Sequence, residues 1–369
     1  MAEPMLRAWM QDWVQPAKRV TDWPGRWVAE AGWPSARIAD KAWALNADGL
    51  GEAPGVLTER SLCSPQTAGL GAGNQCSYGS GPDLSDDQRA DDANSLCFDS
   101  APLAEPIEIL GEARIEIEIA SDQPQALLAV RLCDVAPDGS SLRISYGLLN
   151  LTHRHGPAAP EPLVPGRFER VVIPLCATAT HFDTGHRLRI ALSNAYWPIA
   201  WPSPVANTLT VRCGSARLVL PVRPPQTDDA SLPAFGEPEA AAPLALVETR
   251  ARRTDRPLDR IVTDPDSGCV ELLRERDRGA WRTVDTDVDY DTRGELRFSV
   301  HPDDPGSAEQ DITLTTTMGR TGWRVRTEVH TRIACTAEAF IVKASLRAFE
   351  GDEEVFSRSW DESIARDCV

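Results

Sequence analysis

Residues able to act as nucleophiles are common in this 369-residue chain, but none stands in a pattern that would activate it. The nucleophile elbow G-x-S-x-G is absent, and the G-S-G run at Gly79–Gly81 lacks its flanking residues. The nine cysteines include no C-x-x-C pair, and none has an obvious neighbour that would lower the pKa of its thiol. Phosphate-binding loops of the types G-x-x-x-x-G-K-S/T and G-x-G-x-x-G are also missing. On its own, the sequence predicts no catalytic constellation.

Metal-binding chemistry is indicated just as weakly. His153 and His155, in LTHRHG, have the only metal-like spacing among the six histidines, but a zinc site needs three or four ligands and no third is evident nearby. We interpret this pair as part of a surface turn. A run of aspartates is likewise a weak candidate for a metal site. This run consists of Asp83, Asp86, Asp87, Asp91 and Asp92. Because it lacks the alternate-position spacing and the terminal Glu of a calcium loop, we interpret it as a solvated turn or short helix. No metal or cofactor is expected.

The overall charge limits the possible partners. The formal net charge is -17, so nucleic-acid backbones and anionic membrane surfaces would be repelled. No run approaches the roughly 18 apolar residues of a membrane span, and the first residues lack the features of a signal peptide. Because the cysteines are scattered and odd in number, a reducing cytoplasm is expected, although disulfides remain possible for Cys63, Cys76 and Cys97.

The stretch Phe182–Pro204, FDTGHRLRIALSNAYWPIAWPSP, combines a strand with a stiff loop. Leu188, Ile190 and Leu192 alternate with polar residues, as in a strand with one buried face. Three prolines then prevent regular structure, so the loop should carry Tyr196, Trp197 and Trp201 out of the strand end. These rings could cap the core, which the stretch alone favours, or form a pocket wall or an interface.

The first 45 residues hold six of the eleven tryptophans, at spacings that fit neither a helix nor a strand. LRAWMQ and RWVAE are predicted to be short strands. Large rings in an irregular segment need a surface to cover, since each can bury roughly 150–250 Å². They could wrap the following domain or face a neighbouring one. The docking candidates among them are Trp9, Trp13, Trp23, Trp27 and Trp33.

From Leu96 to Val222 the chain alternates repeatedly in the manner of strands. ARIEIEIAS should place Ile115, Ile117 and Ile119 inward, while ALLAVRLCDV should be more fully buried. About eight strands without crossover helices predict an all-β fold, an antiparallel sandwich or jelly roll. Residues 1–222 form this predicted domain, the Pro-, Ala- and acid-rich residues 223–243 a linker, and residues 244–369 a second, smaller antiparallel β domain.

Several stretches together resemble one family, the CocE/NonD-type serine hydrolases, which are relatives of the Xaa-Pro dipeptidyl-peptidases and include cocaine esterase. They are LRAWMQD, RWVAEAGWP, QRADDANSLCFDSAPL, LAVRLCDVAPDG, SYGLLNLTHR and GHRLRIALSNAYWPIAWPSP, while DRGAWRTVD and VFSRSWDESIARD resemble the C-terminal extension of longer bacterial members. The similar part is the family's C-terminal β-domain, a jelly roll of galactose-binding-like shape. The resemblance covers nearly the whole chain.

The resemblance also accounts for the missing nucleophile. Family members carry a Ser-Asp-His triad in an α/β-hydrolase domain N-terminal to the jelly roll, and LRAWMQD resembles sequence that follows the catalytic histidine. No triad residue can therefore be carried over, and Met1 is expected to be an internal methionine or a start created by a split gene, a frameshift or the design of the clone. In the family the jelly roll helps to close the substrate pocket. That implies a pocket or interface role for Phe98, Asp99, Tyr196, Trp197 and Trp201.

The resemblance implies a non-catalytic accessory portion of a serine hydrolase of esters or amides, whose partner is an α/β-hydrolase catalytic domain. Two alternatives stay open. The chain could be a subunit that completes a separately encoded hydrolase in trans, with the tryptophan-rich segment as its docking surface. It could instead be a carbohydrate-binding module, because galactose-binding-like jelly rolls often bind sugars; this rests on fold analogy alone. The sequence leaves the oligomeric state and the substrate open.

Overall fold

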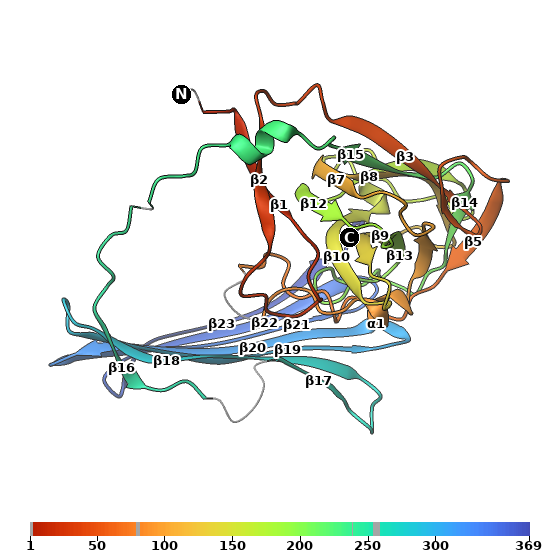
Figure 1. The fold of residues 1–369 in the computed structure, drawn as a ribbon. Coiled ribbons are helices and arrows are strands. Elements are labelled where there is room, and N and C mark those ends of the chain that lie inside the picture. Colours follow the sequence, from red (N-terminus) through yellow and green to blue (C-terminus); the bar gives the residue numbers. More distant parts are fainter. Residues whose placement is uncertain (1–2, 79–81, 238, 254–258) are drawn as a thin grey trace. The chain divides into compact units, whose positions relative to one another are not determined.

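The computed structural model describes residues 3–78, 82–237, 239–253 and 259–369, so the Gly79–Gly81 run lies outside the described residues. The chain folds as two compact units: Met1–Ala234 with Cys368–Val369, and Phe235–Asp367. Strands make up almost all of the regular structure (Figure 1), which confirms the all-β prediction. None of the helices formed by the described residues is long and apolar enough to span a bilayer.

The first unit contains a large sheet and a small sheet. The large sheet has eleven strands in the order β2-β1-β12-β7-β15-β8-β14-β5, with β11 beside β8, β3 beside β15 and β4 beside β3. Its pairings are antiparallel except that of β1 with β12. Its strands are β1 (Leu6–Gln11), β2 (Gly25–Glu30), β3 (Ala39–Asn46), β4 (Gly49–Gly51), β5 (Thr58–Leu62), β7 (Ile107–Gly111), β8 (Arg114–Ser121), β11 (Glu169–Pro174), β12 (Thr178–Phe182), β14 (Leu209–Cys213) and β15 (Arg217–Val222).

The small sheet has four antiparallel strands in the order β10-β9-β13-β6. They are β6 (Leu96–Asp99), β9 (Leu127–Val135), β10 (Ser141–Asn150) and β13 (Arg187–Ser193). One hydrophobic core joins both sheets, since Ile115, Ile117 and Ile119 of β8 pack in the same cluster as the apolar residues of β9 and β13. Every residue of β9 is buried. The sandwich prediction and the two burial patterns are therefore confirmed.

Short helices connect some of these strands. They are α1 (Arg89–Asp92) and the 3-10 turns η1 (Leu151–His153) and η2 (Thr227–Ser231). His153 is half-buried at the end of η1 and His155 is exposed in the turn that follows, as expected for a surface turn. The solvated acidic turn, in contrast, is wrong for Asp91 and Asp92. Both carboxylates lie on α1 and are buried, at 5% and 6% exposure, because arginines and backbone amides surround them.

The first unit extends beyond the predicted start of the linker at residue 223. Arg223 is fully buried, and its guanidinium donates to Glu30 Oε1 at 2.8 Å and to both oxygens of Asp229 at 2.7 and 2.8 Å. It also donates to Glu108 Oε2 at 3.4 Å. This charge cluster holds η2 on the first unit, although the composition of residues 223–234 resembles that of an unstructured connection.

The second unit is one eight-stranded antiparallel sheet in the order β16-β18-β19-β20-β21-β22-β23, with β17 also beside β18. Most neighbours in the sheet are also neighbours in the sequence, as in a meander. The second, smaller antiparallel β region is thus confirmed. Its strands are β16 (Leu246–Arg250), β17 (Asp259–Thr263), β18 (Val270–Thr283), β19 (Val288–His301), β20 (Asp304–Arg320), β21 (Trp323–Cys335), β22 (Ala339–Glu350) and β23 (Glu353–Ala365).

Candidate functional site

Two features of the first unit carry its unusual residues: an aromatic hairpin at its start and a buried polar network around α1. The hairpin consists of β1 and β2, which pair antiparallel with Trp9 directly opposite Trp27. The two indoles meet edge to face with their centroids 5.4 Å apart, and they are 37% and 41% exposed. On the opposite face, Met10 and Val28 are fully buried against Leu110. Alternation therefore anchors one side of the hairpin and presents two tryptophans on the other.

Of the remaining docking candidates, one is exposed and two are half-buried. Trp33, just after β2, is 43% exposed. Trp13 and Trp23 are half-buried in the segment between β1 and β2. Trp23 donates its indole N–H to the carbonyl of Asp12 at 2.9 Å, and Trp9 donates to the carbonyl of Trp23 at 3.2 Å. These bonds fix the connecting segment, so that the exposed rings stand on an ordered base.

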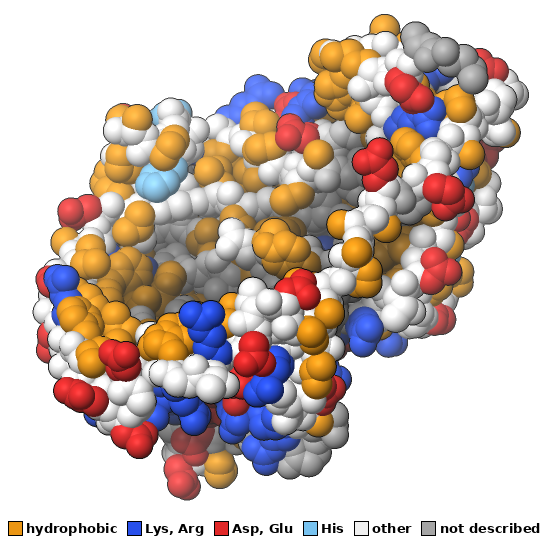
Figure 2. Space-filling model, turned by 90° about the vertical axis from the view of Figure 1, so that its left-hand side faces the viewer, with side chains coloured by type: hydrophobic (Ala, Val, Ile, Leu, Met, Phe, Trp, Pro, Cys, Tyr) orange, Lys and Arg blue, Asp and Glu red, His pale blue; other side chains and the backbone are white. Residues whose placement is uncertain are grey.

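Trp23 also lines a cavity of about 280 Å³ between the β1–β2 connection and β10. Its other lining residues include Ala17, Val20, Arg143 and Tyr146. Tyr146 donates its hydroxyl to the carbonyl of Gln75 at 3.2 Å, and the Arg143 guanidinium stacks 4.7 Å from the Tyr146 ring centroid. On the molecular face shown in Figure 2, hydrophobic and charged side chains are intermixed.

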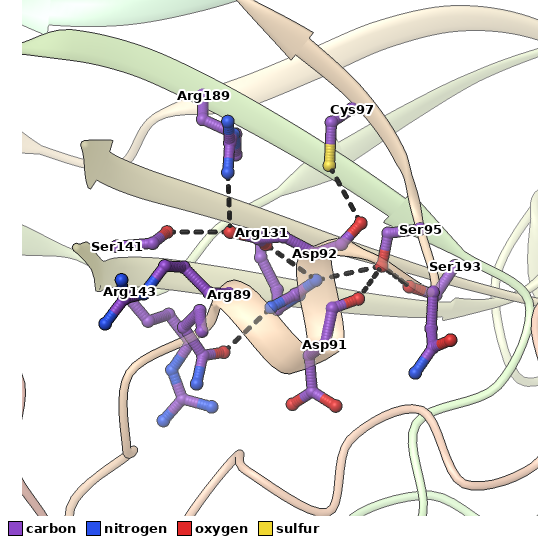
Figure 3. A network of polar contacts seen from close by, with 12 residues as sticks. Arg89, Asp91, Asp92, Ser95, Cys97, Arg131, Ser141, Arg143, Arg189 and Ser193 are labelled. Carbon is purple, nitrogen blue, oxygen red and sulfur yellow. Dashed lines mark hydrogen bonds and ion pairs between the residues drawn. The ribbon is translucent and has the colours of Figure 1, made fainter. Parts of the chain in front are cut away.

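The buried polar network is centred on Asp92 of α1 (Figure 3). Arg131 of β9, only 1% exposed, lies with Nη2 3.0 Å from Asp92 Oδ1, and Arg189 of β13 donates to Asp92 Oδ2 at 2.9 Å. Ser141 of β10 donates to the same Oδ2 at 2.8 Å. One carboxylate therefore joins α1 to three of the four strands of the small sheet.

Further contacts satisfy the rest of the network. Arg131 donates to Gln88 Oε1 and to Ser95 Oγ, each at 2.9 Å. Arg189 binds both oxygens of Asp99 on β6 at 2.7 Å, in the paired geometry typical of arginine and carboxylate. Carboxylate and neutral acceptors surround both guanidinium groups. The network therefore holds α1 against the strands of the small sheet.

The neighbouring titratable groups are poorly suited to nucleophilic chemistry. Burial raises the pKa of the Cys97 thiol to about 11 and that of the Cys133 thiol to about 12. Burial also raises the pKa of the Asp91 carboxyl, against the opposing effects of the Arg131 charge and the amides of Gly69 and Gly71. Both thiols therefore stay protonated at neutral pH, whereas a thiolate is the reactive species.

A second buried pair joins Asp134 of β9 to His186. His186 Nδ1 lies 2.8 Å from Asp134 Oδ1, and the Trp13 indole meets the imidazole edge to face, with centroids 5.6 Å apart. Asp134 is fully inaccessible, and burial raises the pKa of its carboxyl to about 6, with the hydrogen bond from His186 as the main opposing effect. The pair connects the β1–β2 segment to the small sheet.

Asp134 predicts a pH dependence of stability. Because the folded chain holds the Asp134 proton more tightly than the unfolded chain, this residue contributes stability that is complete below about pH 4 and is lost as the pH rises through about 6. Relative to Asp134→Asn, the free energy of unfolding of the unmodified chain should fall by up to about 3 kcal/mol across that interval. Urea titrations at several pH values measure the difference, and parallel stability curves for the two proteins would contradict it.

The residues predicted from the aromatic loop lie mostly in the interior. Tyr196 and Trp197 are each 1% exposed, and Phe98 of β6 is fully buried in the core. Trp201 is half-buried and meets Trp197 edge to face at 4.9 Å, while the Trp197 amide donates to the carbonyl of Ala68 at 2.8 Å. These positions match the core-capping alternative. Only Asp99 and Trp201 of the five candidates present accessible surface, and their pocket or interface role stays a prediction.

Sequence analysis missed the network around Asp92. The available signal was Arg131 itself, a charged residue in the middle of a strand whose pattern predicted burial on both faces. A buried arginine requires carboxylate partners, and the acidic run at residues 83–92 was the nearest rich source of them. Among the residues that the structure describes, no group of three His, Cys, Asp or Glu side chains is placed to hold a metal ion.

The fold and these contacts define a β-sandwich module whose buried polar groups stabilise packing and whose first strands present aromatic side chains. The chain belongs to the family of X-Pro dipeptidyl-peptidase C-terminal non-catalytic domains, whose family model matches residues 1–242. The similarity to the C-terminal β portion of CocE/NonD hydrolases is thereby confirmed, and in those proteins this domain accompanies an α/β-hydrolase catalytic domain.

Individual relatives match only over part of their length. A Mycobacterium bovis protein, named provisionally as a serine esterase, is 31% identical over 160 residues, which cover 38% of this chain and 26% of the relative. Cocaine esterase of Rhodococcus is 26% identical over 103 residues, covering 28% and 18%. The chain therefore matches about a quarter or less of the length of these curated relatives.

Similar solved structures include an α-amino acid ester hydrolase and a CocE/NonD family hydrolase from Staphylococcus aureus. The first is 20% identical with a TM-score of 0.47, over 54% of this chain and 39% of that structure. The second is 11% identical with a TM-score of 0.44, over 60% and 42%.

Proposed function

We propose that this chain is the accessory β portion of a serine hydrolase that cleaves esters or amides, that it is non-catalytic by itself, and that it docks to an α/β-hydrolase domain. The match of residues 1–242 to a non-catalytic domain carries the proposal. The exposed Trp9, Trp27 and Trp33 side chains support it, because large aromatic rings are the side chains most enriched at the energetic centres of interfaces. The docking partner is a catalytic domain of the same protein or a separately encoded subunit.

The histidines support the non-catalytic part of this proposal. His186, His181 and His330 each lie within 3.2 Å of a carboxylate, as the base of a triad would. In the described parts of the chain, however, no serine hydroxyl or cysteine thiol is hydrogen-bonded to any of these rings. We also propose a cytoplasmic location, supported by nine cysteines that are all free thiols.

The isolated chain is expected to turn over neither p-nitrophenyl esters nor Xaa-Pro anilides, because none of its described serine or cysteine side chains is hydrogen-bonded to a histidine ring. Co-expression with the coding sequence immediately upstream, which should contain a G-x-S-x-G segment, is expected to restore turnover. Purified chain whose activity persists and is titrated by a serine-directed phosphonate would contradict the proposal.

The docking surface can be tested separately in that reconstituted protein. Replacing both Trp9 and Trp27 by serine should weaken association with the catalytic domain by roughly 30-fold or more, because even one such ring at the centre of an interface often contributes about 2 kcal/mol. Tyr290→Ser, at a similarly exposed aromatic of the second unit, is the control and should leave affinity unchanged. Equal affinities for both variants, measured by calorimetry, would place the docking surface elsewhere.

A further inference from the structure

The sheet of the second unit ends in a long edge strand, β23 (Glu353–Ala365). Twelve of its thirteen residues pair with β22 on one side, with a β-bulge at Val355, and among the described residues no strand lies on the other. Every side chain of β23 except Trp360 is exposed. The opposite edge of the sheet is formed by β16 and β17, which have five residues each. An edge of this length offers a row of backbone donors and acceptors to a further strand.

One face of β23 carries Phe356, Arg358, Trp360, Glu362 and Ile364 and adjoins an apolar side of the sheet. Its Phe356, Trp360 and Ile364 lie directly opposite Ala348, Ala344 and Phe340 of β22. Phe356 and Ile364 remain 49% and 54% exposed. The same side continues inward across the sheet, where Leu346 of β22 is opposite Val329 of β21, which is opposite Leu314 of β20. A partner that extends the sheet should therefore present apolar residues on this face.

When two copies of β23, EEVFSRSWDESIA, are aligned antiparallel about Trp360, opposite charges and apolar residues fall opposite one another. We propose that β23 pairs antiparallel with β23 of a second copy of this chain, with the twofold axis at Trp360. Trp360 then faces Trp360 of the partner subunit, and Arg358 faces Glu362 of the partner subunit. Phe356 faces Ile364 of the partner subunit. Opposite charges and apolar side chains directly across an antiparallel ladder stabilise it, and a twofold repeats each pair.

Other registers of the same pairing are unfavourable. An axis at Arg358 places this arginine opposite itself, while an axis at Asp361 places that aspartate opposite itself. An axis at Ser359 sets Phe356 against Glu362. An axis between two residues joins the apolar face of one sheet to the polar face of the other, because a shift by one residue exchanges the faces. Of the axes at residues 358 to 361, the one at Trp360 avoids these conflicts.

The test is the oligomeric state of the full chain. Sedimentation equilibrium should show a dimer in the micromolar range. Arg358→Glu and Glu362→Arg each replace both ion pairs by like charges and should weaken the dimer by about tenfold or more, whereas the double variant exchanges the charges and should return to within about threefold of the original affinity. Arg324→Glu, an exposed charge reversal on β21 away from this edge, is the matched control and should have no effect.

Thermal melting of each variant shows whether the sheet stays folded; all three substituted positions are on the surface, so melting temperatures should change little. A chain that remains monomeric throughout the micromolar range would overturn the proposal. So would a dimer that survives both single reversals, or a double variant that stays as weak as either single one.

Discussion

Replacing Arg131 by methionine is expected to lower the free energy of unfolding of the first unit by about 3–5 kcal/mol. The Arg131 guanidinium is 1% exposed and lies 3.0 Å from Asp92 Oδ1. Its removal leaves a buried carboxylate whose charge is compensated by Arg189 alone, and it removes the hydrogen bonds that Gln88 Oε1 and Ser95 Oγ accept from Arg131. Urea unfolding followed by tryptophan fluorescence measures the loss.

Arg89→Met is the matched control because Arg89 lies on α1 itself and pairs with Asp87 at 2.7 Å, but is 59% exposed. It should change stability little, since water replaces an exposed ion pair at small cost. The combined Arg131→Met and Asp92→Leu variant should be less destabilised than the sum of the single changes, because no buried charge is then left without its partner. Equal stabilities of the Arg131 and Arg89 variants would show that the network contributes little.

The second large effect is expected at Trp197. Replacing this 1% exposed indole by alanine should destabilise the first unit by about 3–5 kcal/mol, because the neighbouring backbone cannot collapse fully into the space. Gly69 illustrates how closely the loop is packed. A Cβ atom built on Gly69 would lie 2.8 Å from the Trp197 carbonyl oxygen. Thermal unfolding followed by near-ultraviolet circular dichroism reports on the loss of packing.

Trp201→Ala separates a packing role from an interface role. Trp201 is half-buried and contacts Trp197 edge to face, so its removal should cost clearly less stability than that of Trp197. If Trp201 lines the interface with a catalytic domain, its substitution should weaken association in the reconstituted hydrolase while the isolated chain stays folded. Comparable destabilisation by both substitutions would assign both rings to the core.

The strands could be predicted because their signal is local. In β8 the alternation of Ile115, Ile117 and Ile119 with glutamates is sufficient to assign both a strand and its buried face, and the structure confirms both. The strands LRAWMQ and RWVAE were also predicted, whereas their pairing as the β1–β2 hairpin was not. No such local signal distinguishes Asp92 from the other acidic residues of its segment.

The buried network could not be predicted because its partners are distant in the sequence. Arg189 lies 97 residues from Asp92 and Ser141 lies 49 residues from it, so their meeting depends on how the small sheet is assembled. The same limit applies to the loop aromatics. The core-capping alternative anticipated the burial of Tyr196 and Trp197, but not that the segment around Gly69 covers them, because no periodic pattern connects that segment to them.

The cluster around Arg223 determines how this module can be moved between proteins. A transplanted segment cut at residue 222, where composition suggests that order ends, would omit Arg223 and Asp229 and leave Glu30 and Glu108 without this buried countercharge. A segment cut just after Arg223 would keep the cation beside Glu30 and Glu108 but would lose its paired contacts with Asp229. The smallest transplantable piece therefore includes η2 and ends near Ala234.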